Sequence, residues 1–344
     1  MEKYAIKQYE ISKQQSYIIK GIAILLMLFH HFFTFPQWIV DETIDYSCFS
    51  VLSSPSKLCV CIFAFINGWT FAFRDVSWKD AGYKIKKLLI NYWCIAVPAI
   101  FVGFIVCNQK ITPVLILKEL FGFSNAIMIF AWYIPFYCIS ILVMTAIQRI
   151  IGRNVLSGIA VGVIIPILVF SLLKKFSMTP EIQTMFNNLK HWFPCVSVGF
   201  MSNKYNWLGK LECMTEKVER VILSFIFIIG CFVGRYYASG LDFVYCVLVV
   251  FAIMSLKIKD NSIIGKILQM CGKNSSNMWF LHCLFFGEFT RTFFQPFAYF
   301  ARMPVLVYLV ALIELLLMSE LIEKIKSKIL PGGEILRNAS KNQE

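Results

Sequence analysis

The stretch of sequence that decides the fold is IIKGIAILLMLFHHFFTF, residues 18–35, which is long and almost wholly apolar. A helix that crosses the hydrocarbon core of a bilayer needs roughly 20 mainly apolar residues, with a range of about 17–25. The run ends in histidine and aromatic residues and lacks the small residues of a signal-peptide cleavage site. We therefore interpret it as a transmembrane helix and not as a cleavable signal peptide.

The composition extends this interpretation to the whole chain. Of its 344 residues, 58% are apolar, 16% aromatic and only 15% charged, whereas soluble domains are about 45–50% apolar and about 25% charged. This excludes a soluble enzyme, a disordered chain and a disulfide-rich secreted scaffold. We expect an all-α polytopic membrane protein with about ten transmembrane helices in one bundle.

The predicted spans are 18–35, 58–73, 88–106, 130–148, 154–173, 187–203, 221–236, 241–256, 275–291 and 303–322. They divide the chain into an N-terminal tail over residues 1–17, a transmembrane domain over 18–322 and a C-terminal tail over 323–344. The segment 107–129 is predicted to be an outer connection with an apolar stripe that lies in the membrane interface.

The basic residues predict the orientation. The chain has 33 Lys and Arg against 20 Asp and Glu, a net charge of +13. If the N-terminus is cytoplasmic, 24 of the 33 basic residues fall on that side of the predicted spans, as positive-inside sorting requires. Both termini are therefore predicted to be cytoplasmic, and the basicity indicates topology and contact with anionic lipid rather than nucleic-acid binding.

Cysteine and histidine do not form a metal-binding pattern. Most of the twelve cysteines fall inside apolar spans, and no pair has Cys-x-x-Cys spacing. We expect buried free thiols that act as small apolar residues. The four histidines make no ligand cluster, so no metal is predicted.

Ionisable side chains at membrane depth cost ~2.5–3.5 kcal/mol on insertion scales and are functional candidates by default. Lys20 and His31 are eleven residues apart, so on a helix they share one face, separated by about 16 Å along the axis. His30 lies about 80° away from that face. This stripe suits an extended ligand with phosphates at one end and a reactive acyl group at the other. The alternative is a Lys that reaches the interface and a His that bonds a neighbouring helix.

Two later segments also carry polar groups. Ser275 and His282 are seven residues apart and nearly eclipsed on a helix, although such stripes also serve helix packing. Glu288 and Glu314 are expected to form structural ion pairs with basic residues near the outer surface, namely Arg291 or Arg302.

Five motifs, in order, resemble those of the acyltransferase-3 family of integral-membrane O-acyltransferases. The first is Lys20-Gly21, an apolar run and His31, which has the spacing of the family's first-helix signature. The others are Phe63-Ala-Phe-Ile-Asn67-Gly68-Trp, Lys84-Ile-Lys86-Lys87-Leu-Leu-Ile-Asn91-Tyr92-Trp93, Ala131-Trp132-Tyr133-Ile134 and the segment from Ser275 to His282. The sequence departs from the family where Lys20 replaces Arg, Asn67 replaces Ser and Asn91 replaces a common Pro.

The resemblance implies transfer of an acyl group, most often acetyl, from acyl-CoA to a hydroxyl of a cell-surface or lipid-linked glycan in the bacterial cytoplasmic membrane. Acyl-CoA would be a co-substrate, and no bound cofactor is implied. His31 is expected to be the general base and His282 a second catalytic residue. The residues expected to bind the acyl donor are Lys20, Lys84, Lys86, Lys87 and Ser275. Those expected to bind the acceptor are Trp132, Tyr133 and Asn67.

Other functions compete with this one. A transporter or flippase of a lipid-linked glycan also explains many spans with polar groups inside them, but its inverted repeats and paired broken helices are not seen in the sequence. A non-catalytic scaffold leaves the Lys20–His31 stripe unexplained. Trp132 and Tyr133 also fit an aromatic belt at the membrane interface.

Overall fold

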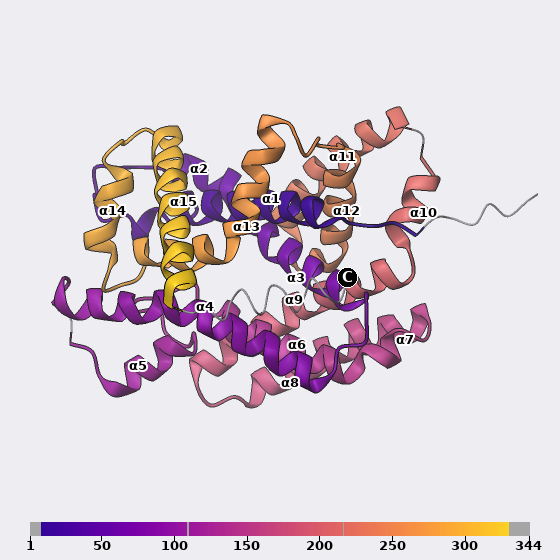
Figure 1. Cartoon of the computed structure of the whole chain (residues 1–344), viewed down its shortest axis with the longest axis horizontal. Helices are drawn as coiled ribbons and strands as arrows, with labels where there is room; N and C mark the ends of the chain where they lie inside the picture. Colours follow the sequence, from indigo (N-terminus) through magenta and orange to yellow (C-terminus); the bar gives the residue numbers. More distant parts are fainter. Residues whose placement is uncertain (1–7, 109, 216, 330–344) are drawn as a thin grey trace, which may run out of the picture. The chain divides into compact units, whose positions relative to one another are not determined.

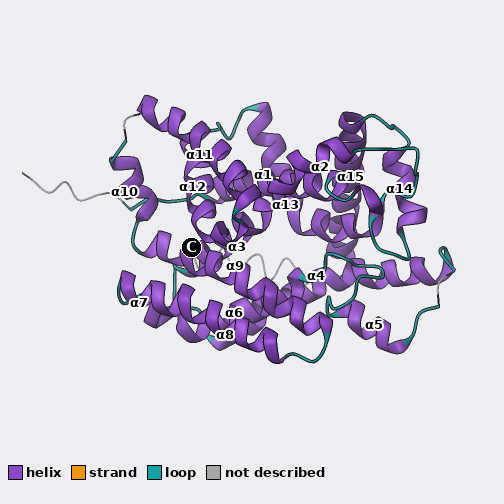
Figure 2. Ribbon diagram, turned by 180° about the vertical axis from the view of Figure 1, so that it is seen from behind, coloured by secondary structure: helices purple, strands orange, loops and turns teal. Residues whose placement is uncertain are grey.

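The computed structural model describes residues 8–108, 110–215 and 217–329, which form helices joined by turns and loops, without a strand (Figure 2). The outer parts of the two predicted tails, residues 1–7 and 330–344, lie outside the described residues. The all-helical fold class is thus confirmed.

The first helices are α1 (Lys13–Phe33), η1 (Pro36–Trp38), α2 (Ser47–Ser53), η2 (Ser54–Lys57), α3 (Leu58–Phe71), α4 (Trp78–Ile105) and α5 (Pro113–Leu120). The next are α6 (Tyr133–Ile151), α7 (Val155–Ile159), the π-helical turn η3 (Ala160–Ile164), α8 (Ile165–Phe176), α9 (Pro180–Lys204) and α10 (Trp207–Cys213). The last are α11 (Lys217–Tyr237), η4 (Ser239–Leu241), α12 (Asp242–Ser255), α13 (Ile263–His282), η5 (Cys283–Phe285), α14 (Arg291–Tyr299) and α15 (Pro304–Ile329) (Figure 1).

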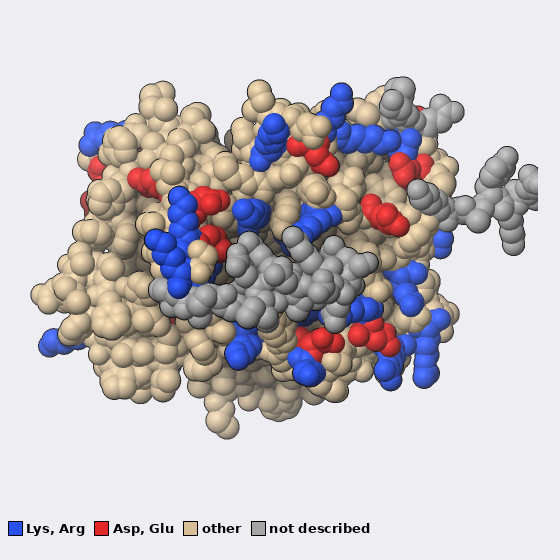
Figure 3. All heavy atoms as spheres, viewed as in Figure 1, with Lys and Arg blue, Asp and Glu red and all other residues tan. Residues whose placement is uncertain are grey.

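Among the described residues, seven helical segments are long and apolar enough to cross a membrane. They are Lys13–Phe33, Ser47–Phe71, Trp78–Ile105, Tyr133–Ile151, Val155–Phe176, Glu219–Tyr237 and Pro304–Lys328. The other three predicted spans correspond to α9 and α13, which are more polar, and to α12, which is shorter. The structure therefore supports a multi-pass membrane protein, while the count of about ten stays a prediction. Figure 3 shows mainly uncharged surface, with scattered basic and acidic groups.

One predicted boundary is wrong. The sequence predicted a span over 275–291, but α13 ends at His282 and the chain then turns through η5. Beyond it, the backbone N–H of Phe289 donates to the carbonyl of Ala126 at 2.8 Å, and a side chain at Gly287 would overlap the carbonyl of Ile127. The apolar run thus ends its helix because its backbone pairs with another segment.

The described chain forms two compact units, and the predicted bounds of the transmembrane domain, 18–322, stay a prediction. Unit 1 comprises residues up to Lys87 and the range Trp132–Ser275, and unit 2 comprises Leu88–Ala131 and the residues from Ser276 onward. Helices α4 and α13 are therefore shared between the units.

Glycines position the central helices of unit 1. Helix α3 packs mainly against α9, and a Cβ at Gly68 would overlap the carbonyl of Val196, as one at Gly199 would overlap that of Phe65. Only glycine permits this backbone contact. The Gly of the Asn67-Gly68 motif therefore has a packing role.

Glycines also allow the backbones of α1 and α13 to approach closely. A side chain at Gly21 would overlap the carbonyl of Leu268, and one at Gly272 would overlap that of Tyr17. Helix α1 begins with a capping box, in which the Ser12 hydroxyl and the Gln15 side chain each bond the other residue's backbone N–H. The cap and this close crossing determine the position of Lys20, next to Gly21, within unit 1.

Unit 2 contains a polar contact among α4, α13 and α15. The Lys326 ammonium donates to the side-chain oxygens of Asn91 and Glu323, and at 3.0 Å to that of Asn277. The Asn277 amide donates to Glu323 at 2.8 Å. Asn91 thus gives α15 a hydrogen-bond acceptor at a position where the family commonly has Pro.

Candidate active site

The adjacent histidines at the end of α1 have different surroundings in unit 1. His30 is buried, and its Nδ1 lies 3.1 Å from the carbonyl oxygen of Ser53 and 3.0 Å from the Thr34 hydroxyl. A carbonyl only accepts, so Nδ1–H of His30 donates to it. The Thr34 hydroxyl also contacts the Ser53 hydroxyl at 2.8 Å. His30 therefore ties α1 to the α2–η2 junction.

His31 has a different neighbour at Nδ1. Its Nδ1 lies 3.1 Å from the sulfur of Met27, one turn earlier on α1, and its ring packs near-parallel to that of Phe35 at 6.3 Å. His31 is 8% exposed and His30 is 3% exposed. Because a thioether sulfur is a weak acceptor, this contact with Met27 is weaker than the hydrogen bond from Nδ1 of His30 to the Ser53 carbonyl.

Lys20 and Ser275 lie beside the close crossing of α1 and α13 in unit 1. Lys20 is half-buried and has no hydrogen bond or ion pair within the described part of the chain. Ser275 is buried, and its hydroxyl donates to the carbonyl of Gly272 at 2.8 Å, within its own helix. The structure therefore places both donor candidates on the two helices that meet at Gly21.

The other predicted donor residues lie in the first turns of α4. Lys84 is half-buried, with its ammonium 4.3 Å from the centre of the Phe71 ring. Lys86 and Lys87 are exposed. The predicted span began after these residues, but α4 begins at Trp78, so the basic run is helical.

The predicted acceptor residues come together in unit 1. The Asn67 amide donates to the Tyr133 hydroxyl at 3.0 Å, joining α3 to the start of α6. The rings of Trp132 and Tyr133 pack edge to face at 6.0 Å. All three are half-buried, so each presents surface for contact.

Sequence reasoning missed a group of residues beside these. Trp192 of α9 stacks on Trp132 at 4.9 Å, and its indole N–H donates to Asp242 at 3.1 Å. Asp242 forms a buried, two-pronged ion pair with Arg235, at 2.9 and 3.2 Å. A signal was present, since Arg235 and Asp242 are charges that interrupt apolar runs on either side of a short connection between α11 and α12.

His282 lies in unit 2, so the structure does not place it relative to His31. It is fully buried, its Nδ1 bonds the Trp279 carbonyl of its own helix, and its ring stacks on Phe130 at 5.0 Å with an interplanar angle of 3°. The Trp279 indole N–H donates to the Phe130 carbonyl at 3.2 Å. Segment 121–131 is thus fastened to the end of α13.

A buried carboxylate holds that segment. Glu119 accepts the backbone N–H of Ile127 at 2.8 Å and that of Met128 at 2.9 Å, and its backbone carbonyl accepts the Tyr92 hydroxyl. Burial raises the pKa of Glu119 above its ordinary value, although its hydrogen bonds act in the opposite direction. Glu119 thereby sets the position of Phe130 against His282.

The ion pairs expected of Glu288 and Glu314 are not found among the described residues. Neither carboxylate forms a salt bridge to Arg291 or Arg302 within the described residues. Glu288 is exposed. One buried oxygen of Glu314 has no hydrogen-bond partner in the described part of the chain.

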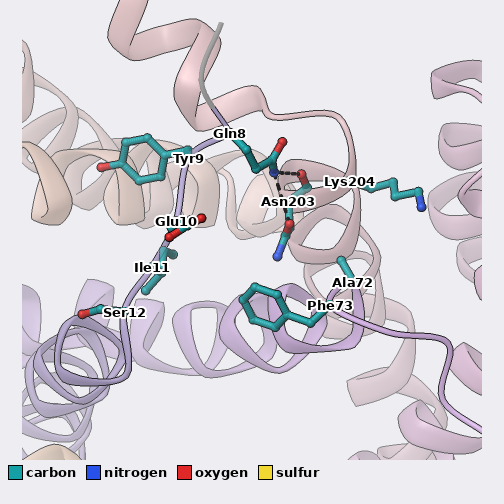
Figure 4. Close-up of a pocket in the computed structure, with 9 residues that line it drawn as sticks. All are labelled: Gln8, Tyr9, Glu10, Ile11, Ser12, Ala72, Phe73, Asn203 and Lys204. Carbon is teal, nitrogen blue, oxygen red and sulfur yellow. Dashed lines mark hydrogen bonds between the residues drawn. The ribbon is translucent and has the colours of Figure 1, made fainter. Parts of the chain in front are cut away.

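A pocket of unit 1 with a volume of about 430 Å³ contains none of the predicted site residues (Figure 4). It lies where the N-terminal segment meets the end of α9, and the Gln8 amide donates to the Asn203 carbonyl at 2.8 Å. Burial, and then the charge of Glu212, raises the pKa of Tyr9 beside it to about 12. The pocket is lined by Gln8, Tyr9, Glu10, Ile11, Ser12, Ala72, Phe73, Asn203 and Lys204.

All twelve cysteines are free, and seven of them are buried. Among the described residues, no group of three His, Cys, Asp or Glu side chains is arranged to hold a metal ion.

Comparison with known families shows that residues 17–319 match a family model described as an acyltransferase domain. Comparison with curated proteins and with solved structures finds no match. The matched range contains every predicted site residue and ends within α15.

Proposed function

Because the chain belongs to the acyltransferase-3 family and is a membrane acyltransferase, we propose that it moves an acyl group, in the first instance acetyl, from acyl-CoA to a hydroxyl of a glycan. The glycan is at the cell surface or lipid-linked. The protein is proposed to lie in the bacterial cytoplasmic membrane with both termini cytoplasmic, so that donor binds from the side of the basic loops.

The observation that carries this proposal is the difference between the two histidines. Nδ1 of His30 is engaged by Ser53 and Thr34, whereas Nδ1 of His31 lies 3.1 Å from the sulfur of Met27 on its own helix, and a thioether sulfur is a weak acceptor. With the proton on Nδ1, the lone pair of His31 is on Nε2. A neutral imidazole in this form is a general base.

The proposed reaction is a direct transfer. Nε2 of His31 takes the proton of the acceptor hydroxyl while its oxygen attacks the thioester carbonyl. The new C–O bond forms, the C–S bond breaks, and the proton passes from the imidazolium to the leaving thiolate as CoA-SH. His282 is proposed as a second catalytic residue.

Donor phosphates are proposed to bind Lys20, with Lys84, Lys86 and Lys87 adding positive charge and Ser275 of α13 adding a hydroxyl. The supporting observation is that the Lys20 ammonium has no carboxylate partner among the described residues. An ammonium binds phosphate as a point charge, without the two-pronged geometry of Arg.

The acceptor is proposed to bind Trp132, Tyr133 and Asn67. A half-buried indole offers an apolar face to a sugar ring, and the neighbouring hydroxyl and amide offer hydrogen bonds. The contact between Asn67 and Tyr133 already pre-orders these two groups.

The test uses purified protein in detergent, radiolabelled acetyl-CoA and cell-envelope glycan. Loss of a general base lowers the rate about 10²–10⁴-fold, so His31→Ala should transfer almost no label. His30→Asn, which keeps an N–H donor for Ser53, is the matched control and should retain transfer.

Equal transfer by wild type and His31→Ala would remove His31 from the chemistry. Absence of CoA binding to the wild-type protein would reject the proposed donor. Gel filtration and CoA binding of His31→Ala show whether that variant is folded.

A further inference from the structure

A cationic side chain at the start of α3 has no counter-ion among the described residues of unit 1. Lys57 is half-buried, and its ammonium lies 5.2 Å from the centre of the Trp192 ring. Within the described part of the chain it forms no salt bridge or hydrogen bond. A cation–π contact of this kind is worth about 0.5–2 kcal/mol, so it does not replace an ionic partner.

The carboxylate of Asp242, which acts electrostatically on Lys57, is already used. Asp242 accepts Nε of Arg235 at one oxygen, and Nη2 of Arg235 and the Trp192 indole N–H at the other. Arg235, Asp242 and the nearby Lys57 together carry a net charge of +1. Binding of an anion stabilises a half-buried cation that has no ionic partner.

Trp192 connects this cation to the proposed acceptor residues. Its ring contacts the Lys57 ammonium and stacks on Trp132 at 4.9 Å, so Lys57 and Trp132 are within about 10 Å of each other. Trp192 itself is only 5% exposed, whereas Lys57 and Trp132 present surface. Lys57 and Trp132 thus both contact the Trp192 ring, which supports them.

The turn η2 connects the cation to the histidines. Ser53 O accepts from His30 at 3.1 Å, and the next carbonyl, that of Ser54, accepts from Arg235 at 3.5 Å. Lys57 ends this same turn. The turn is thus held by α1 through His30, the neighbour of His31, and by α11 through Arg235.

We propose that Lys57 and Trp132 form an acceptor subsite for an anionic sugar, with the carboxylate or phosphate of the sugar on Lys57 and its ring on Trp132. This rests on the proposed function and adds to it the charge of the acceptor. Trp192 and the Arg235–Asp242 pair are positioning residues that hold the two contact groups.

The test measures binding without acyl donor, so that it does not depend on catalysis. Wild-type protein in detergent is titrated with three sugars that share one aglycone, a glucuronide, a glucose 6-phosphate and a neutral glucoside, and tryptophan fluorescence is followed. The variants are Lys57→Gln, which removes the charge, and Lys57→Arg, which retains it. Lys175→Gln, at an exposed lysine of the same unit, is the matched control.

We expect wild type to bind at least one anionic sugar about tenfold or more tightly than the glucoside, since a hydrogen bond to a charged group is worth a factor of ten or more. Lys57→Gln should remove the preference, whereas Lys57→Arg and Lys175→Gln should keep it. The preferred anion shows whether the source is a carboxylate or a phosphate.

Equal affinity of wild type for all three sugars, no binding of any of them, or an unchanged preference in Lys57→Gln would overturn the subsite. The wild-type comparison decides the matter even if the variants do not fold. A preserved anionic preference without acyl transfer would instead overturn the proposed function and leave the subsite in place.

Discussion

The buried ion pair of Arg235 and Asp242 provides the sharpest test of the packing in unit 1. Their side chains are 8% and 3% exposed, and the carboxylate accepts three hydrogen bonds, two from Arg235 and one from Trp192. Removal of one partner from such a pair costs about 3–5 kcal/mol, because the other charge stays buried and uncompensated. Asp242→Asn should therefore lower the thermal midpoint of the detergent-solubilised protein by on the order of 10 °C.

A surface pair is the matched control. Arg149 and Asp75 lie 3.4 Å apart and are 82% and 70% exposed, so Asp75→Asn removes the same charge where solvent screens it. Exposed pairs contribute about 0–1 kcal/mol, and we expect a midpoint change of no more than a few degrees.

A double variant separates charge burial from loss of packing. Arg235→Met with Asp242→Leu replaces the pair by apolar groups, which is often neutral or stabilising, so most of the lost midpoint should return. The indole N–H of Trp192 then lacks its acceptor, which costs about 1–3 kcal/mol and keeps the recovery incomplete. Equal small shifts for Asp75→Asn and Asp242→Asn, or a double variant no more stable than Asp242→Asn, would refute the reasoning.

Three further predictions use the same melting assay, the second together with chemical modification of histidine. Gly68→Ala should lower the midpoint by far more than a typical Gly-to-Ala change in a helix, since the added Cβ overlaps the Val196 carbonyl; an unchanged midpoint would contradict this backbone contact. Phe130→Ala should cost about 3–5 kcal/mol and expose the ring of His282, which histidine modification would detect, and unchanged modification would reject the stack. Burial raises the pKa of Glu119, so its contribution to stability is fully present below the ordinary glutamate pKa and is lost as pH rises through its pKa in the folded protein. Glu119→Gln should therefore reduce the pH dependence of the melting midpoint. Identical pH profiles for wild type and Glu119→Gln would disprove the raised pKa of Glu119.

Much of the fold could be predicted from the sequence, since the signal is local. Apolar runs of helical length locate α1, α4, α6, α11 and α15, because a bilayer span must be both long and apolar. The signal fails at the end of α13, where apolar residues leave the helix after His282 to pair with segment 126–127. Helix propensity and hydropathy do not include such long-range backbone contacts.

The candidate site also has features that the sequence predicts and features that depend on distant contacts. The sequence by itself determined the family, the face shared by Lys20 and His31, and the candidates Asn67, Trp132 and Tyr133, because motif spacing and helical periodicity are properties of neighbouring residues. It did not distinguish the contacts of His30 from those of His31, which depend on Ser53 from a separate helix.

Only the tertiary structure decided which distant residues share a neighbourhood. Lys57, Trp192, Arg235 and Asp242 come from three separate regions of the sequence and meet in unit 1. Their pairing follows from the cost of burying a charge, since Arg235 takes Asp242 and leaves Lys57 without a carboxylate. The sequence counts these charges, but only packing determines which of them is left unpaired, and that residual cation is what indicates an anionic ligand.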